Sequence, residues 1–271
     1  MQELKDKVAF ITGGAQGIGL GIAQAFAAEG VKIALADINT DALSAAAEKL
    51  GSATEVKTFE LDVRDRDRYA QVAAETEATV GPVSLLFNNA GVAPAVPVQA
   101  MTYQSWDWAI DINLKGVING LQTFLPAMLK RGDEGHVVST ASGAGLAVAG
   151  SGYLYTTTKF AVVGLSESLR QELESTRIGV SVLCPGPVDT NILTNTRRVQ
   201  PRSENAQIED VIDAAVASAA DFLKSGKSID EVGQCVLRAV KANELYIHTD
   251  AYMASFVRAR TDAILAAMPP T

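Results

Sequence analysis

Tyr155 and Lys159 are the two side chains whose types and spacing could carry out acid–base chemistry. Four residues apart on a helix, a phenol and an ammonium group lie on the same face. A free tyrosine has a pKa of about 10, too high for a base at neutral pH, but a fixed positive charge nearby favours the phenolate and lowers that pKa. The pair could therefore move a proton to or from an alcohol oxygen.

A glycine-rich turn, Thr12-Gly13-Gly14-Ala15-Gln16-Gly17-Ile18-Gly19, joins an apolar run to an amphipathic stretch. Glycine is needed where the backbone turns tightly or approaches another group closely, and the start of a helix attracts phosphate. The spacing G-x-x-x-G-x-G differs from the G-x-G-x-x-G of the common dinucleotide fingerprint. We predict a pyrophosphate site here; the alternative is a tight turn without a ligand. The predicted cofactor contacts in the turn are Gly13, Gln16, Gly17, Ile18 and Gly19.

Asp37, at the end of the next apolar run, bears on which dinucleotide would bind. A carboxylate there can accept hydrogen bonds from the adenosine-ribose hydroxyls and would repel a 2′-phosphate. Gln16 and Ile38 are not basic, so a 2′-phosphate would meet no cation unless Lys32 or Arg64 swung in. We therefore predict NAD as the cofactor, with Asp37 and Ile38 among its contacts. The alternative for Asp37 is a solvated loop residue or helix cap.

Seven short runs, most of them apolar, alternate with helical stretches and are the elements that must position these residues. Strands that are apolar on both faces, with helices between them, mean a parallel sheet covered on both sides. The sequence thus predicts an α/β fold: one doubly wound Rossmann-type domain over residues 1–271, with a parallel seven-stranded sheet flanked by helices. The strands are expected at residues 8–11, 33–36, 56–61, 83–87, 136–139, 180–184 and 245–248, and long helices at 103–130 and 155–176.

Residues 191–227 depart from this alternation. They begin polar, with Arg197, Arg198 and Arg202, and become helical over residues 208–223. Ligands of open α/β sheets bind beyond the carboxyl ends of the strands, where this excursion starts, so we predict a helical substrate lid over 191–227. The three arginines are expected to be solvated, although they could instead meet an acidic substrate group.

Composition excludes several classes of protein. The chain of 271 residues has a formal charge of −8 without clustered Lys and Arg, so no nucleic-acid partner is expected. No apolar stretch approaches the roughly 20 residues that span a bilayer, and the charged N-terminus is no signal peptide, so we expect no membrane contact. Two cysteines cannot form a disulfide framework, and no Cys/His cluster has metal spacing, which predicts a cytoplasmic protein without a metal site. His136 and His248, at strand ends, are expected to be structural.

Spaced motifs over residues 5–190 together resemble the short-chain dehydrogenase/reductase family. In order, they are the turn with Gly13, Gly17 and Gly19; Asn88-Asn89-Ala90-Gly91; Asn113; Ser142; Tyr155 with Lys159; and Pro185-Gly186. The resemblance implies a hydride transfer between NAD(H) and a secondary alcohol or its ketone. It also implies the sheet order 3-2-1-4-5-6-7.

The resemblance implies a role for each matched residue. Tyr155 would be the catalytic acid/base, Lys159 would lower its pKa and hold the nicotinamide ribose, and Ser142 would hydrogen-bond the reacting oxygen. Asn113 would hold a water that passes protons from Lys159 to solvent. The other implied cofactor contacts are Asp62 and Val63 at the adenine, Asn89 along the adenosine, Val188 and Thr190 at the carboxamide, and Gly91.

The residues expected at the substrate are largely apolar, which predicts a small-molecule alcohol or ketone with a hydrophobic body. The expected substrate contacts are Ser142, Tyr153, Tyr155 and Leu193, beside residues 93–96 and 144–146. Tyr153 could equally be a packing aromatic. A long helical stretch, 251–268, replaces the glycine-rich segment with which many family members build a tetramer, but a homo-oligomer, dimer or tetramer, is still expected.

Three other functions compete with an NAD-dependent alcohol dehydrogenase. The first is an NADPH-dependent carbonyl reductase on the same scaffold, which residues 16, 37 and 38 would discriminate. The second is a nucleotide-sensing protein without turnover, which would have no need of Asn113, Ser142, Tyr155 and Lys159 together. The third is a dehydratase or epimerase, which would use a longer C-terminal substrate domain. A hydrolase is not favoured, because no G-x-S-x-G motif is present.

Overall fold

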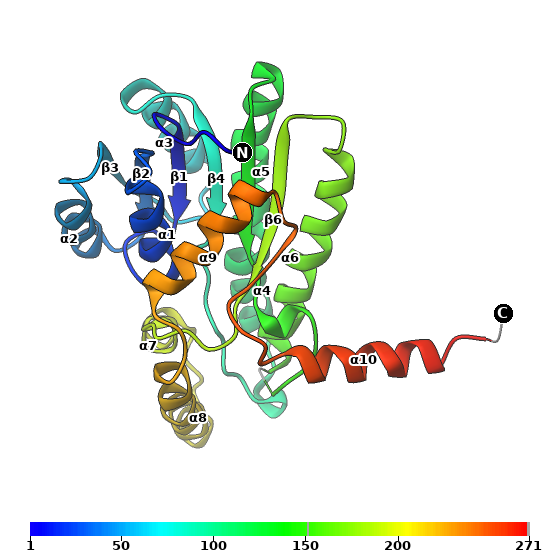
Figure 1. Ribbon diagram of the computed structural model, residues 1–271. Coiled ribbons are helices and arrows are strands. Elements are labelled where there is room, and N and C mark those ends of the chain that lie inside the picture. Colours follow the sequence, from blue (N-terminus) through cyan, green and yellow to red (C-terminus); the bar gives the residue numbers. More distant parts are fainter. Residues whose placement is uncertain (151, 270–271) are drawn as a thin grey trace.

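The computed structural model describes residues 1–150 and 152–269 and is built around one seven-stranded sheet (Figure 1). The strand order is β3-β2-β1-β4-β5-β6-β7, and every neighbouring pair is parallel. Both the fold class and the order implied by the family resemblance are therefore confirmed. The strands are β1 (Val8–Thr12), β2 (Lys32–Asp37), β3 (Val56–Glu60), β4 (Val83–Asn88), β5 (Gly135–Thr140), β6 (Ile178–Cys184) and β7 (Tyr246–His248).

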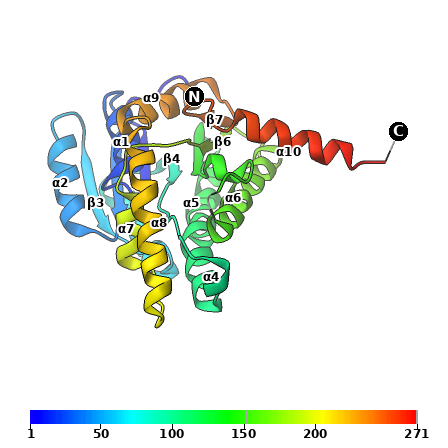
Figure 2. The ribbon, with the colours of Figure 1, turned by 90° about the horizontal axis from the view of Figure 1, so that it is seen from below.

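Helices cover both faces of the sheet (Figure 2). Successive residues of a strand point to opposite faces, so Ile11 and Leu85 join the hydrophobic core on one face, while Phe10 and Leu86 join the core on the other. Both cores are apolar, which explains why the central strands read as continuous hydrophobic runs. One face carries α1 (Gly17–Ala27), α2 (Thr40–Leu50) and α9 (Ile229–Ala242); the other carries α3 (Arg66–Thr79), α5 (Gly116–Arg131) and α6 (Tyr153–Glu172).

The helix expected over residues 103–130 is interrupted, which corrects the sequence prediction. It consists of α4 (Tyr103–Ile110), a π-helical turn η2 (Asp111–Lys115) and α5. A π turn takes in an extra residue, and such turns are frequent at functional sites. This turn contains Asn113, whose side chain bonds to the main chain of Val92 beyond β4. The second long helix, α6, begins at Tyr153 rather than at Tyr155.

Three helices lie outside the layered body. α7 (Ile192–Val199) and α8 (Ala206–Lys224) occupy the segment predicted as a lid, beyond the carboxyl ends of the strands (Figures 1 and 2). α10 (Ala254–Ala266) projects away from the body, and none of its residues is buried. Short 3-10 turns, η1 (Val98–Ala100) and η3 (Gly143–Gly145), complete the elements. No helix within the described ranges is long and apolar enough to cross a membrane.

His136 is a buried polar residue of β5 with a structural role. Its Nε2 lies 2.8 Å from the Ser181 hydroxyl on β6, and Ser181 in turn donates to the carbonyl oxygen of Glu244. Burial lowers the pKa of His136 to about 3, because a charged imidazole would lose its water. His248, at the end of β7, is exposed.

Acid should destabilise the fold through His136. Its folded pKa lies below the ordinary 6.5, so the unfolded chain takes up a proton that the folded chain refuses between pH 6.5 and 3. The free energy of unfolding should therefore fall by about 1.4 kcal/mol per pH unit below 6.5 through this group. Urea unfolding at pH 7 and pH 5 measures this effect. Between these pH values the free energy of unfolding of His136→Asn should fall by about 2 kcal/mol less than that of the wild type.

The matched control is His248→Asn, which removes an exposed histidine and should follow the wild type. If His136→Asn and the wild type lost equal stability between pH 7 and 5, the buried neutral imidazole would not be the acid-sensitive group.

Candidate active site

The glycine turn between β1 and α1 forms a close backbone cradle. Gly13 and Gly17 have φ values of +61° and +56°, the left-handed region that favours glycine. A Cβ on Gly13 would lie 2.9 Å from the Cα of Ala90, and one on Gly19 would lie 2.2 Å from the carbonyl oxygen of Gly13. Gly13 and Gly19 therefore have no room for a side chain. It leaves the N-terminus of α1 beside a cavity, as a pyrophosphate site requires.

Polar side chains hold this turn against β4. Asn89 Nδ2 donates to the carbonyl oxygens of Thr12 (3.1 Å) and Gly13 (3.2 Å). Thr12 Oγ1 accepts from the main-chain N–H groups of Asn89 (3.0 Å) and Ala90 (3.1 Å). Asn89 thus fixes the shape of the cradle as well as lining the cavity. Thr12 was missed by sequence reasoning, because a threonine at the end of a strand looks like an ordinary β-branched strand residue.

Asp37 lies at the end of the same cavity and is firmly held. Only 9% of its surface is exposed, and its carboxylate accepts from Asn39 N (3.0 Å) and Ala15 N (3.3 Å). Burial raises the pKa of Asp37, while these N–H donors act to lower it. These hydrogen bonds argue against the alternative in which Asp37 is a solvated residue that turns away from the cavity.

The two basic residues considered in the sequence analysis as partners of a 2′-phosphate are already paired. Arg64 Nη2 lies 2.6 Å from Asp62 Oδ2, and Lys32 Nζ lies 3.2 Å from Glu55 Oε2. Burial acts to raise the pKa of Asp62, but hydrogen bonds from Arg64 and its charge outweigh burial and lower it. Swinging either cation toward a phosphate would break an existing ion pair.

Tyr155 and Lys159 come together in the first turns of α6. Lys159 is only 4% exposed; its Nζ donates to the Thr140 carbonyl oxygen (2.9 Å) and lies 5.6 Å from the centre of the Tyr155 ring. Burial lowers the pKa of Lys159 to about 8. Burial also raises the pKa of Tyr155, and the hydrogen bond to Ser142 only partly opposes it. The net shift of the Tyr155 pKa is therefore upward, because desolvation of the phenolate is the larger effect, and the lowering of this pKa by Lys159 stays a prediction.

Asn113 lies behind these residues and acts through its contacts. Its Oδ1 accepts from Val92 N (2.8 Å), and its Nδ2 donates to Val92 O (2.9 Å) and Thr158 Oγ1 (3.1 Å). It therefore ties the loop after β4 to α6. Gly91 lies between: a Cβ there would be 3.1 Å from Asn113 Oδ1 and 3.4 Å from Lys159 Nζ. Water relay through Asn113 stays a prediction.

Two cavities meet at Tyr155. The first, of about 320 Å³, reaches from Asp37 past the glycine turn to Lys159. The second, of about 490 Å³, lies between Ser142 and α8. Residues that line both are Ile18, Tyr155, Pro185, Thr190 and Ile192. A group bound in either cavity can therefore reach the same phenol.

Most of the predicted contacts line one of these cavities. In the first are Gly13, Gln16, Gly17, Ile18, Asp37, Ile38, Asp62, Val63, Asn89, Gly91, Tyr155, Lys159 and Thr190. In the second are Ser142, Tyr155, Val188, Thr190 and Leu193. Gly19 packs inside the turn, and Tyr153 is not among the described residues that line either cavity. Tyr153 instead packs on Trp106, with 5.4 Å between ring centres, so the packing alternative holds for it.

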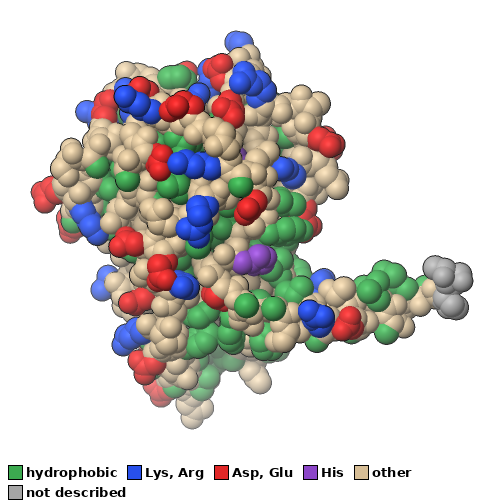
Figure 3. Space-filling model, viewed as in Figure 1, with side chains coloured by type: hydrophobic (Ala, Val, Ile, Leu, Met, Phe, Trp, Pro, Cys, Tyr) green, Lys and Arg blue, Asp and Glu red, His purple; other side chains and the backbone are tan. Residues whose placement is uncertain are grey.

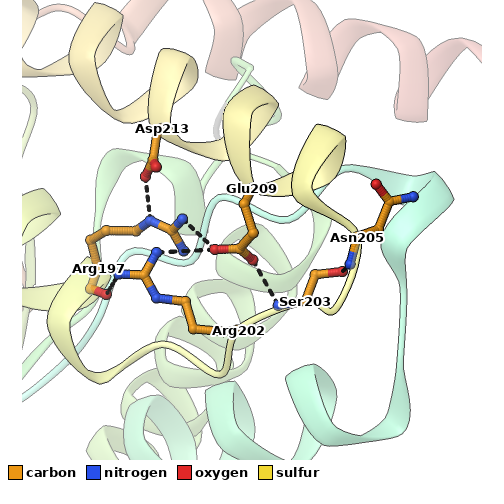
Figure 4. Close-up of polar contacts among 6 residues, drawn as sticks. All are labelled: Arg197, Arg202, Ser203, Asn205, Glu209 and Asp213. Carbon is orange, nitrogen blue, oxygen red and sulfur yellow. Dashed lines mark hydrogen bonds and ion pairs between the residues drawn. The ribbon is translucent and has the colours of Figure 1, made fainter.

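An ion network joins α7 to α8 within the segment predicted as a lid (Figure 4). Arg197 is buried and contacts Glu209 and Asp213, each at 2.5 Å, and Arg202 reaches Glu209 at 3.0 Å. The Ser203 N–H, Arg202 and Arg197 lower the pKa of Glu209 to about 2. The prediction of solvated arginines is thus wrong for Arg197, whose charge is satisfied by α8.

α7 also supplies two cavity residues that sequence reasoning missed, Asn195 and Thr196. They line the first cavity together with Arg198, one of the three arginines expected to be solvated, and Thr196 Oγ1 accepts from Ala93 N at 2.8 Å. No motif marks them, because their positions depend on how α7 packs beside the strand ends.

Comparison with known proteins agrees with this geometry. The family model for short chain dehydrogenase matches residues 7–201. The C alpha-dehydrogenase of Sphingobium sp. (strain NBRC 103272 / SYK-6) is 37% identical over 250 residues, covering 91% of this chain and 81% of that protein. The galactitol 2-dehydrogenase of Agrobacterium fabrum is 36% identical over 186 residues, covering 69% and 72%.

A solved structure shares the whole fold. The crystal structure of a short chain dehydrogenase/reductase from Burkholderia phymatum in complex with NAD has a TM-score of 0.92 and 33% identity, covering 100% of this chain and 98% of that one. The fold, the matched residues 7–201 and these relatives agree. This chain therefore belongs to the short-chain dehydrogenase/reductase family and is an oxidoreductase.

Proposed function

We propose that this chain is an NAD-dependent dehydrogenase that interconverts a secondary alcohol with a hydrophobic body and its ketone. The observation that carries the proposal is the position of Tyr155, where a cavity lined by the glycine turn and Asp37 meets a cavity lined by apolar side chains. Similarity to dehydrogenases and to a structure solved with NAD supports it. Cytoplasmic location and a homo-oligomeric state stay predictions from the sequence.

The residues of the first cavity fit a dinucleotide. The glycine cradle, with no room for Cβ atoms, suits a pyrophosphate, and the held carboxylate of Asp37 suits ribose hydroxyls. When bound, NAD supplies the hydride acceptor at its nicotinamide ring. The residues that would hold it elsewhere are Asp62 and Val63 at the adenine, Lys159 at the nicotinamide ribose, and Val188 and Thr190 at the carboxamide.

The chain's own contribution to the reaction is the management of one proton. During oxidation, the Tyr155 phenolate takes the proton from the alcohol hydroxyl as the hydride leaves the carbinol carbon; during reduction, the phenol returns it to the ketone oxygen. The Ser142 hydroxyl, on the same cavity, would hydrogen-bond that oxygen. Because burial raises the pKa of Tyr155, the neutral phenol is favoured, and oxidation should speed up as pH rises above neutrality.

A screen of alcohols and ketones with NAD(H) and NADP(H), followed by the absorbance of the reduced cofactor, tests the proposal. Turnover of secondary alcohols with NAD is the expected result. Turnover with NADPH alone would favour the carbonyl reductase. Cofactor binding without turnover would favour a nucleotide sensor.

Tyr155→Phe should retain cofactor binding and lose turnover. The phenyl ring fills the same space, but the positioned acid/base is gone, which costs roughly 10²–10⁴-fold in rate. Steady-state kinetics and NADH fluorescence measure the two effects. Tyr153→Phe is the matched control, because Tyr153 packs on Trp106 and should leave the rate within about threefold. Activity of Tyr155→Phe within threefold of the wild type would remove Tyr155 from the mechanism.

The enzyme should prefer NAD over NADP by about a hundredfold or more in kcat/KM, or roughly 3 kcal/mol. A 2′-phosphate would face the Asp37 carboxylate, while Arg64 and Lys32 are held by Asp62 and Glu55. Replacing Asp37 by Ser and Ile38 by Arg should narrow or reverse the preference, because it removes the repulsion and adds a phosphate-binding fork. Equal wild-type efficiency with both cofactors would refute the assignment.

Residues 191–227 should become protected when ligands bind. Ile212 is the only buried residue of α8, so this helix packs weakly on the body and its amides open readily. With NAD and a ketone at about ten times their dissociation constants, amide exchange there should slow roughly tenfold. Hydrogen exchange followed by mass spectrometry measures this, with the buried helix α9 as an internal reference. Equal protection with and without ligands would make the segment an ordinary packed subdomain.

A further inference from the structure

The second cavity carries no charged side chain among the described residues that line it. Its polar side-chain groups are four hydroxyls, those of Ser142, Tyr155, Thr190 and Tyr252. The first two already have a role at the reacting oxygen. A charged group on the rest of a substrate would therefore lose its water without gaining a partner, which is costly.

α8 forms one wall of this cavity through an apolar stripe. Members of the stripe recur every three or four residues, so they lie on one side of the helix: Val211, Ile212, Ala215, Val216, Ala219, Phe222 and Leu223. The large side chains at its ends, Val211 and Phe222, are 55% and 44% exposed. A helix that turns large apolar side chains toward an open cavity, rather than into a core, is suited to covering an apolar ligand.

The middle of the stripe is hollow, because Ala215 and Ala219 lie one helical turn apart with side chains of a single methyl group. At the far end, the turn before α10 continues the wall through Tyr252, whose ring lies 5.3 Å from the Phe222 ring and 5.9 Å from the Phe256 ring of α10. Figure 3 shows hydrophobic side chains gathered between α8 and the start of α10. The cavity of about 490 Å³ is in the range that encloses a drug-sized molecule.

We propose that the substrate is a bulky, uncharged secondary alcohol or ketone whose apolar body lies against α8, and that Ala215 and Ala219 set the upper limit on its size. The inference rests on the proposed function and narrows it. Small alcohols would leave most of the cavity unfilled, and polyols or hydroxy acids would bury polar groups against an apolar wall. Ala215 and Ala219 are thus specificity-determining residues.

Binding of a series of methyl ketones, from butan-2-one to undecan-2-one, tests the substrate class without relying on turnover. Isothermal titration calorimetry on the full chain with NAD, which cannot give a hydride to a ketone, should show Kd falling about fourfold per added methylene, the equivalent of roughly 0.8 kcal/mol, until the cavity is full. A keto acid of the same length as a tightly bound ketone should bind at least about a hundredfold more weakly. A Kd independent of chain length, or equal binding of the keto acid, would overturn the proposal.

Variants of α8 test the size limit. Ala215→Leu and Ala219→Leu should each weaken binding of the longest ketones by about tenfold or more and leave the shortest unchanged, because the added side chain fills the hollow. Ala217→Leu is the matched control: it makes the same change on an exposed position of α8 outside the cavity lining. Equal effects of all three substitutions, or no effect of the first two, would overturn the role of Ala215 and Ala219. Thermal unfolding of each variant separates loss of folding from loss of binding.

Turnover of each ketone with NADH, recorded in parallel, separates the two proposals. Chain-length-dependent binding without turnover of any ketone would reject the dehydrogenase function and leave the ligand class standing. Efficient turnover of small or charged ketones, with no gain from apolar length, would reject the substrate class and leave the dehydrogenase standing.

Discussion

Parallel pairing of all seven strands is the constraint on which the site depends. Because the strands run in one direction, their carboxyl ends lie at one edge, and the segments that follow them must gather there. The glycine turn follows β1, Asp37 ends β2, Asp62 follows β3 and Asn89 follows β4. Ser142 and Pro185 follow β5 and β6 in the same way. Residues more than a hundred positions apart in the chain thereby come to line two adjoining cavities.

Backbone segments approach one another closely at this edge and are held there by polar side chains. The hydrogen bonds of those side chains must all be made. Asn89 and Thr12 bind the glycine turn to β4, and Asn113 binds the next loop to α6. A buried amide costs free energy unless its hydrogen bonds are made, so each asparagine stabilises the structure only in this arrangement. Lys159 is an exception to this rule, and the proposed acid–base chemistry depends on it. Its ammonium is buried with one main-chain acceptor, Thr140 O, and its pKa falls to about 8.

The predicted lid segment lines both cavities, and the two cavities differ in polarity. α7 contributes polar residues to the first cavity, which also contains the carboxylates of Asp37 and Asp62, whereas α8 contributes an apolar stripe to the second. Arg197 binds the two helices through Glu209 and Asp213, so the charges of the lid satisfy one another away from the apolar stripe. One segment can therefore cover a charged ligand and an apolar ligand side by side, with Tyr155 at the boundary.

The sequence by itself determined the strands, the sheet class, the glycine turn, the pairing of Tyr155 with Lys159 and the position of Asp37. These follow from local rules: side-chain periodicity, the conformations open to glycine, and the i, i+4 spacing of a helix. Only the tertiary structure decided that Tyr153 packs on Trp106, that Arg197 is buried, that Asn113 lies in a π turn, and that burial raises the pKa of Tyr155. Each of these depends on burial and on contacts between distant segments, which no local pattern records.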